Sequence, residues 1–135
     1  MDHLLTGAVV VLADDLMWSI RIMEAVRRAG GTPLRLGSEA ELGIAVEAHD
    51  SGDEPTLGGA IVDMAARGFD AVAAIGRLRA VRLPVIAVAQ HDDQLTRRRA
   101  LDAGASRVFS YQKFFADGTR LVEGWLRAAA SGEGR

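Results

Sequence analysis

The sequence predicts an α/β fold: a three-layer sandwich in which helices cover both faces of a doubly wound, five-stranded parallel sheet. Five short apolar runs alternate with five segments whose apolar residues recur at helical spacing. Several of these runs are continuously apolar, as is typical of strands that are buried on both faces. Because each strand-helix-strand crossover is right-handed, the alternation indicates a flavodoxin-like (βα)5 arrangement.

All five expected units fall within one domain, residues 1–130, followed by a disordered tail at residues 131–135. The expected strands occupy residues 8–13, 33–36, 57–62, 84–89 and 106–110. The expected helices occupy residues 16–29, 38–49, 69–81, 92–103 and 114–130.

The first two units are bounded by recognisable start and stop residues. Residues 8–13 form a β-branched run, and the amphipathic segment that follows ends at Gly30, as helices commonly do. The second strand, residues 33–36, is the weakest of the five. Ser38 followed by Glu41 resembles a capping box, which indicates that the second helix starts there.

The last three units repeat the pattern. The run at 57–62 is apolar and is closed by Asp63, and a helical pattern resumes at about Phe69. Residues 84–89 form another continuously apolar strand. Gly104 then ends the fourth helix ahead of the short fifth strand. Residues 114–130 have the spacing of a final amphipathic helix.

Composition excludes several classes of protein. The 135 residues carry a formal net charge of -2 without a separate block of Lys or Arg, which argues against a nucleic-acid surface or a polybasic membrane anchor. There are no cysteines, which excludes disulfides and Cys-ligated zinc. No apolar run is long enough to cross a bilayer, and the N-terminus lacks the basic start of a signal peptide. We therefore expect a cytoplasmic protein.

Three acids follow predicted strands. Asp14 and Asp15 come directly after the first, and Asp63 comes after the third. Ligands of open parallel sheets bind outside the carboxyl ends of the strands, so these carboxylates should converge there. Such oxygen ligands suit Mg²⁺, and Asp63 is the best-placed nucleophile for attack on a phosphoryl group. The alternative is that the acids only cap helices and end strands.

Four segments resemble the response-regulator receiver family: VVVLADD ending at Asp15, AIVD ending at Asp63, PVIAVA from residue 84, and ALDAGAS ending at residue 106. The resemblance covers about residues 8–126. It implies that Asp63 is the phosphoacceptor and that Asp14 and Asp15 hold Mg²⁺, directly or through water. The remaining metal ligands it implies are Asp63 and the backbone carbonyl of Ala65.

The sequence departs from the family pattern at the positions that sense the phosphoryl group. Ala89 stands where the family has a Ser or Thr hydroxyl, and a methyl group cannot donate a hydrogen bond. Ser110 or Tyr111 stands where the family has a Lys, while Lys113 lies further along. Lys113 is a second candidate cation for the pocket if the loop is reordered, and otherwise a solvated residue near the start of the last helix. After Asp63 the loop is shorter than usual and contains Arg67, whose charge either neutralises the acidic pocket without metal or faces solvent.

The sequence therefore predicts a stand-alone receiver-like signalling domain of a two-component phosphorelay, which acts by protein contact rather than by enzymatic turnover. Its expected partners are a histidine kinase or phosphotransfer protein and an output protein. One alternative is a pseudo-receiver that works without phosphorylation. Another is a small Mg²⁺-dependent phosphotransfer enzyme, which the adjacent acids and the short chain disfavour. A homodimer would use the apolar stripe of the last helix, formed by Leu121, Val122, Trp125 and Leu126.

Overall fold

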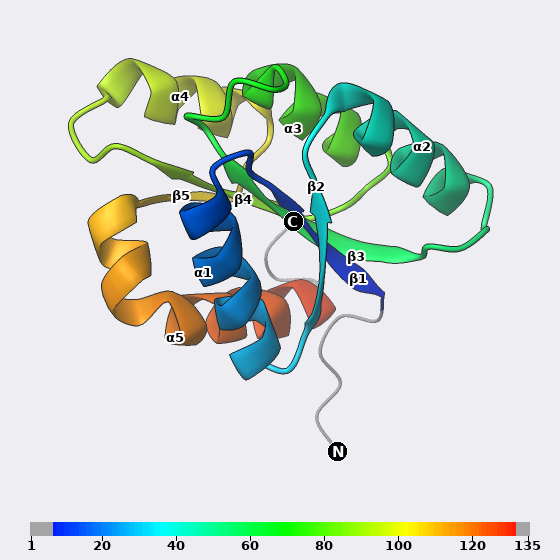
Figure 1. Cartoon of the computed structure of the whole chain (residues 1–135), viewed down its shortest axis with the longest axis horizontal. Helices are drawn as coiled ribbons and strands as arrows, with labels where there is room; N and C mark the ends of the chain where they lie inside the picture. The colour runs from blue at the N-terminus through cyan, green and yellow to red at the C-terminus, as the bar shows by residue number, and fades with distance from the viewer. Residues whose placement is uncertain (1–6, 132–135) are drawn as a thin grey trace.

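The computed structural model describes residues 7–131, so all but the first residue of the expected tail lies outside the described range. Five parallel strands form one sheet in the order β2-β1-β3-β4-β5 (Figure 1). The strands are β1 (Ala8–Leu12), β2 (Thr32–Leu36), β3 (Leu57–Asp63), β4 (Val85–Ala89) and β5 (Arg107–Ser110). The helices are α1 (Leu16–Arg28), α2 (Glu39–Asp50), α3 (Ala71–Ala80), α4 (Gln94–Ala103) and α5 (Tyr111–Ala130). The predicted fold class is confirmed.

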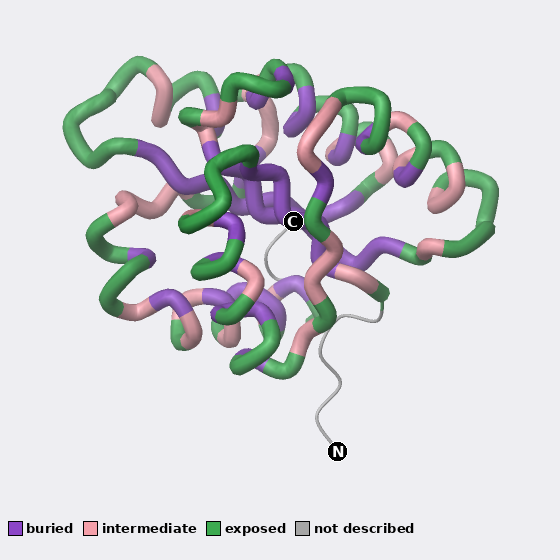
Figure 2. Tube along the Cα trace, in the orientation of Figure 1, coloured by how far each residue is buried: buried purple, intermediate pink, exposed green. Residues whose placement is uncertain are grey.

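The helices cover both faces of the sheet, with α1 and α5 on one face and α2, α3 and α4 on the other (Figure 1). Along β1, Val9 and Val11 pack beneath α1 and α5, while Val10 and Leu12 belong to the core on the opposite face. Successive strand residues point to opposite faces, so both sets must be apolar. The three central strands β1, β3 and β4 are accordingly the most deeply buried part of the molecule (Figure 2).

The strand order reverses beside β1, which has β2 on one side and β3 on the other. In the pairing of β1 with β3, Leu12 lies opposite Val62. The residues that follow these two strands therefore emerge at the same edge of the sheet. This edge is the one at which open parallel sheets bind ligands.

The capping predicted for α2 is present, since Ser38 Oγ accepts a hydrogen bond from the Glu41 amide at 3.2 Å. Helix α5 begins at Tyr111, three residues before the expected start at 114, because Ser110 is its N-cap and accepts from the Lys113 amide at 3.0 Å. The expected start at 114 follows from the apolar stripe of this helix, which begins only at Phe114. The early start places Tyr111 in the first turn, directly after β5.

The apolar stripe of α5 is core rather than surface. Val122, Trp125 and Leu126 are all buried against α1 and the sheet. The homodimer surface expected there is therefore wrong, because the stripe covers the face of the sheet that α1 leaves open. Within residues 7–131, no helix combines the length and hydropathy needed to span a membrane.

Candidate functional site

A pocket of about 410 Å³ opens at the carboxyl ends of β1 and β3. It is lined by Asp14, Asp15, Trp18, Asp63, Ala65, Arg67, Gln90 and Tyr111. Most residues singled out from the sequence thus meet in one place. Lys113 does not line this pocket, and neither does Ala89, although it ends the neighbouring strand β4.

Asp63 ends β3 and is only 2% exposed. Its Oδ1 accepts a hydrogen bond from the Ala65 amide at 3.0 Å and another from the hydroxyl of Tyr111. Burial raises the pKa of the Asp63 carboxyl, the two donors oppose that rise, and the negative charges of Asp14 and Asp15 add to it. The carboxylate is therefore costly to ionise, and Tyr111 is one of two groups that stabilise its charge.

Tyr111 reaches Asp63 from the first turn of α5, on the far side of β4. Its ring packs against Trp18 of α1, with ring centroids 4.7 Å apart and planes tilted by 45°. Burial, followed by the bond to Asp63, raises the pKa of the Tyr111 phenol well above its ordinary value, so the hydroxyl remains a donor at neutral pH. The Trp18 and Tyr111 pair thus holds the hydroxyl on the carboxylate.

Asp14 is exposed but firmly bonded. Its Oδ2 accepts from the backbone amides of Arg67 at 2.6 Å and Gly68 at 2.7 Å. These two donors hold the pKa of Asp14 below its ordinary range. Gly68 is needed here, because a Cβ at this position would lie 2.9 Å from the carbonyl oxygen of Gly37. Asp14 therefore anchors the loop after β3.

Asp15 is the N-cap of α1 and accepts from the Trp18 amide through Oδ1 at 2.9 Å. Asp15 therefore has the helix-capping role that is the alternative to metal binding for these acids. Arg67, one of two candidate pocket cations, lines the pocket but contacts Asp14 through its amide. Its guanidinium makes no ion pair within residues 7–131.

The arrangement of the acids does not fit a magnesium site. One oxygen of each of the three carboxylates accepts a hydrogen bond from a protein donor. Among the residues that the structure describes, no group of three or more His, Cys, Asp or Glu side chains is placed to hold a metal ion. Ala65, expected to offer its carbonyl, donates its amide to Asp63. Carboxylates are suitable Mg²⁺ ligands, but one oxygen of each of these three is already bound to a protein donor.

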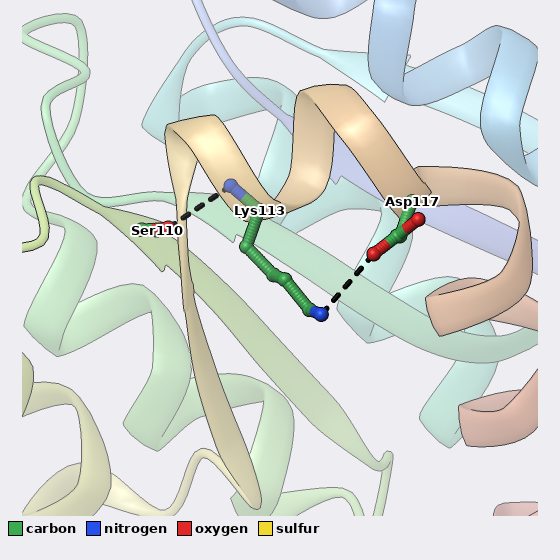
Figure 3. Close-up of polar contacts among 3 residues, drawn as sticks. All are labelled: Ser110, Lys113 and Asp117. Atoms are coloured by element: carbon green, nitrogen blue, oxygen red, sulfur yellow. Dashed lines mark hydrogen bonds and ion pairs between the residues drawn. The ribbon is translucent and has the colours of Figure 1, made fainter.

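The remaining switch positions offer no contact for a phosphoryl group. Ala89 is 2% exposed and pairs with Ser110 of β5, and its methyl group has no hydrogen to donate. The ammonium of Lys113 lies 3.1 Å from a carboxylate oxygen of Asp117 on the same helix, as Figure 3 shows. Lys113 is therefore not a cation of the acidic pocket.

Sequence reasoning missed two features of the site. Gln90 lines the pocket directly after β4, and a polar residue at a strand's carboxyl end was a signal that could have found it. The second is the hydroxyl of Tyr111. In the sequence this residue stands out only because it replaces the family's lysine, and nothing there predicts a contact for its hydroxyl.

Known structures share this architecture. A response-regulator receiver domain from Rhodospirillum rubrum is 18% identical, with a TM-score of 0.70 over 87% of this chain and 92% of that one. The chain has the receiver-domain fold. A CheY-like receiver domain from Methanospirillum hungatei is 13% identical, with a TM-score of 0.73 over 93% of this chain and 98% of that one.

A third similar structure contains a metal ion. The receiver domain of a sensor histidine kinase from Pseudomonas aeruginosa, with magnesium coordinated in its active-site cleft, is 18% identical to this chain. Its TM-score is 0.68, over 89% of this chain and 97% of that one. No protein-family model and no curated protein matches the sequence.

Proposed function

We propose that this receiver-fold chain is a signalling module that works by protein contact and without phosphorylation, the pseudo-receiver alternative raised by the sequence. The observation that carries the proposal is the hydrogen bond from the Tyr111 hydroxyl to Asp63 Oδ1. Both hydrogen bonds to Asp63 reach Oδ1, so a phosphoryl donor would have to approach Oδ2 through the pocket that Tyr111 also lines. Here a phenol fixed by Trp18 lies against that carboxylate.

The charges around Asp63 also disfavour a phosphoryl group. A phosphorylated aspartate would add negative charge beside Asp14 and Asp15, and among the described residues Arg67 is the single cationic side chain that lines this pocket. The hydroxyl and the lysine that would bind the group are replaced by Ala89 and Tyr111. A phosphorylated state would therefore lack the contacts by which it could change the shape of the domain.

Contact with another protein is supported by the exposed side of α1. Leu16, Met17 and Ile20 are large apolar residues in its first two turns, and between half and two-thirds of each is exposed. Phe115 of α5 is also exposed, and the guanidinium of Arg21 on α1 lies 3.9 Å from its ring centroid. Clustered exposed apolar residues are typical of interaction surfaces. The partners we propose are a histidine kinase or phosphotransfer protein and an output protein.

The test is an amide NMR titration of the native chain, first with Mg²⁺ and then with beryllofluoride, which mimics a phosphoryl group on aspartate. We expect no saturable shifts around Asp14, Asp15 and Asp63. Saturable shifts there that disappear in Asp63→Asn would overturn the proposal and establish a phosphorylation-responsive receiver. The receiver domain from Pseudomonas aeruginosa that coordinates magnesium is the positive control.

A further inference from the structure

A second and larger pocket, of about 790 Å³, lies beside the edge strand β5, between α4 and α5. Residues at the amino-terminal ends of β4 and β5 line it. The pocket therefore lies at the opposite ends of the strands from the acidic pocket. The two pockets share no lining residue. The second pocket is therefore a separate site from the acidic pocket.

The lining of this pocket is positively charged. Arg79 from α3, Arg107 from β5 and Arg120 from α5 all contribute, and none of its lining residues is Asp or Glu. The whole chain, by contrast, has a formal net charge of -2. Three cations around one concavity repel each other, and a bound anion would relieve that repulsion. Guanidinium groups also match the planar or forked oxygens of carboxylates and phosphates.

The three arginines differ in how they are held. The guanidinium of Arg79 donates a hydrogen bond to the Leu83 carbonyl at 3.3 Å. The side chain of Arg79 also packs on Gly104, where a Cβ would come within 2.7 Å of Arg79 Cγ. Gly104 adopts a φ of +122°, so both its backbone and this close approach favour glycine. The side chains of Arg107 and Arg120 make no hydrogen bond or ion pair within residues 7–131. Their donors are free to bind a ligand.

An unpaired donor belongs to the same pocket. Trp125 lines it and is 6% exposed, and its indole N–H is buried without an acceptor among the described residues. Buried polar groups in proteins nearly always have a partner. The ring packs closely on Gly59, where a Cβ would lie 3.0 Å from its Cη2 atom. An acceptor brought by a ligand would satisfy this N–H after a small local adjustment.

Size and the remaining wall residues narrow the class of ligand. Phe109 and Leu121 give the pocket an apolar wall beside the arginines. A volume of about 790 Å³ is within the range of sites for small organic molecules and is far more than one phosphate ion requires. We propose that this pocket binds a small polyanion that carries an aromatic ring, the chemical class of nucleoside phosphates.

The test is isothermal titration calorimetry of the full chain with ADP, together with adenosine and inorganic pyrophosphate as separate probes. We expect ADP to bind more tightly than either fragment. Arg107→Ala and Arg120→Ala should each weaken ADP binding about tenfold, as expected when a charged hydrogen bond is lost. The matched control is Arg98→Ala, which removes the same charge from the exposed side of α4, outside the pocket.

Three calorimetric outcomes would overturn the proposal. The first is no saturable binding of ADP. The second is an equal loss of affinity in Arg98→Ala, because general charge attraction would then account for binding. The third is pyrophosphate binding as tightly as ADP, which removes the argument for a ring. As a local readout, the indole N–H resonance of Trp125 should shift on titration with ADP, and its remaining unchanged would also contradict this site.

Discussion

The hydroxyl of Tyr111 donates a hydrogen bond to Oδ1 of Asp63, the carboxylate that ends β3. The two residues are far apart in sequence, and the strand order separates β3 from β5 by only one strand. A tyrosine in the first turn of α5 is long enough to reach across β4. This contact places a phenol against the candidate phosphoacceptor, and most of the following predictions concern it.

Tyr111→Phe should raise the pKa of Asp63 further. Burial, which raises that pKa, remains in this variant, while the hydroxyl that lowers it is removed. Loss of a hydrogen bond to a buried charge should also reduce the free energy of unfolding by about 1–3 kcal/mol. Carbon-detected NMR titration of the Asp63 carboxyl measures the first effect and urea denaturation the second. An unchanged or lower pKa would show that the bond is absent in solution.

Asp63→Asn should increase the free energy of unfolding at neutral pH. The folded-state pKa of Asp63 is raised above the ordinary value of 3.8, so the folded state binds this proton more tightly than the unfolded state does. Stability therefore falls as pH rises from 3.8 through the folded-state pKa. Asn keeps the shape and can still accept from Tyr111. Urea denaturation should show that the advantage of Asn shrinks as pH is lowered towards 3.8, and a constant advantage contradicts this account.

Asp14→Ala should destabilise the protein with the opposite pH dependence. The folded-state pKa of Asp14 is lowered, so its contribution is present above the ordinary value of 3.8 and is lost as pH falls through the folded-state pKa. Because the side chain is exposed, we expect a loss of about 1 kcal/mol at neutral pH, below the full value of two charged hydrogen bonds.

Hydrogen exchange provides the local measurement for Asp14→Ala. The amides of Arg67 and Gly68 should exchange faster in this variant, because each loses its acceptor. Asp15→Ala is a suitable control, since it removes the cap of α1 but leaves the bonds to this loop intact. Equal protection of the two amides in both variants would argue against the anchoring role of Asp14.

Trp18→Ala should lower the pKa of Asp63, in contrast to Tyr111→Phe. The Trp18 ring lines the pocket and packs on Tyr111, so its removal admits water and reduces the burial that raises the pKa of the carboxyl. The lost ring contact should also cost about 1 kcal/mol of stability. Met17→Ala, at an exposed neighbouring position outside the pocket, should leave the pKa unchanged. The carboxyl NMR titration distinguishes the two variants.

The sequence by itself determined the order of strands and helices along the chain. It also determined the end of the strands at which the acids meet. These features follow from local patterns: continuously apolar runs, helical spacing, the capping pair Ser38 and Glu41, and acids directly after strands. The receiver resemblance depended on the same patterns, and the architecture of known receiver domains confirms it at the level of fold.

Only the tertiary structure decided what the acids contact. Whether Asp63 faces a metal, an arginine or a phenol depends on where α5 begins and on the direction of one side chain across β4, and no spacing in the sequence encodes either. Likewise, Arg67 contributes its amide rather than its charge because the loop after β3 folds onto Asp14. The arginine-lined pocket joins α3, β5 and α5, so its charge was invisible in a sequence where acids and bases are evenly mixed.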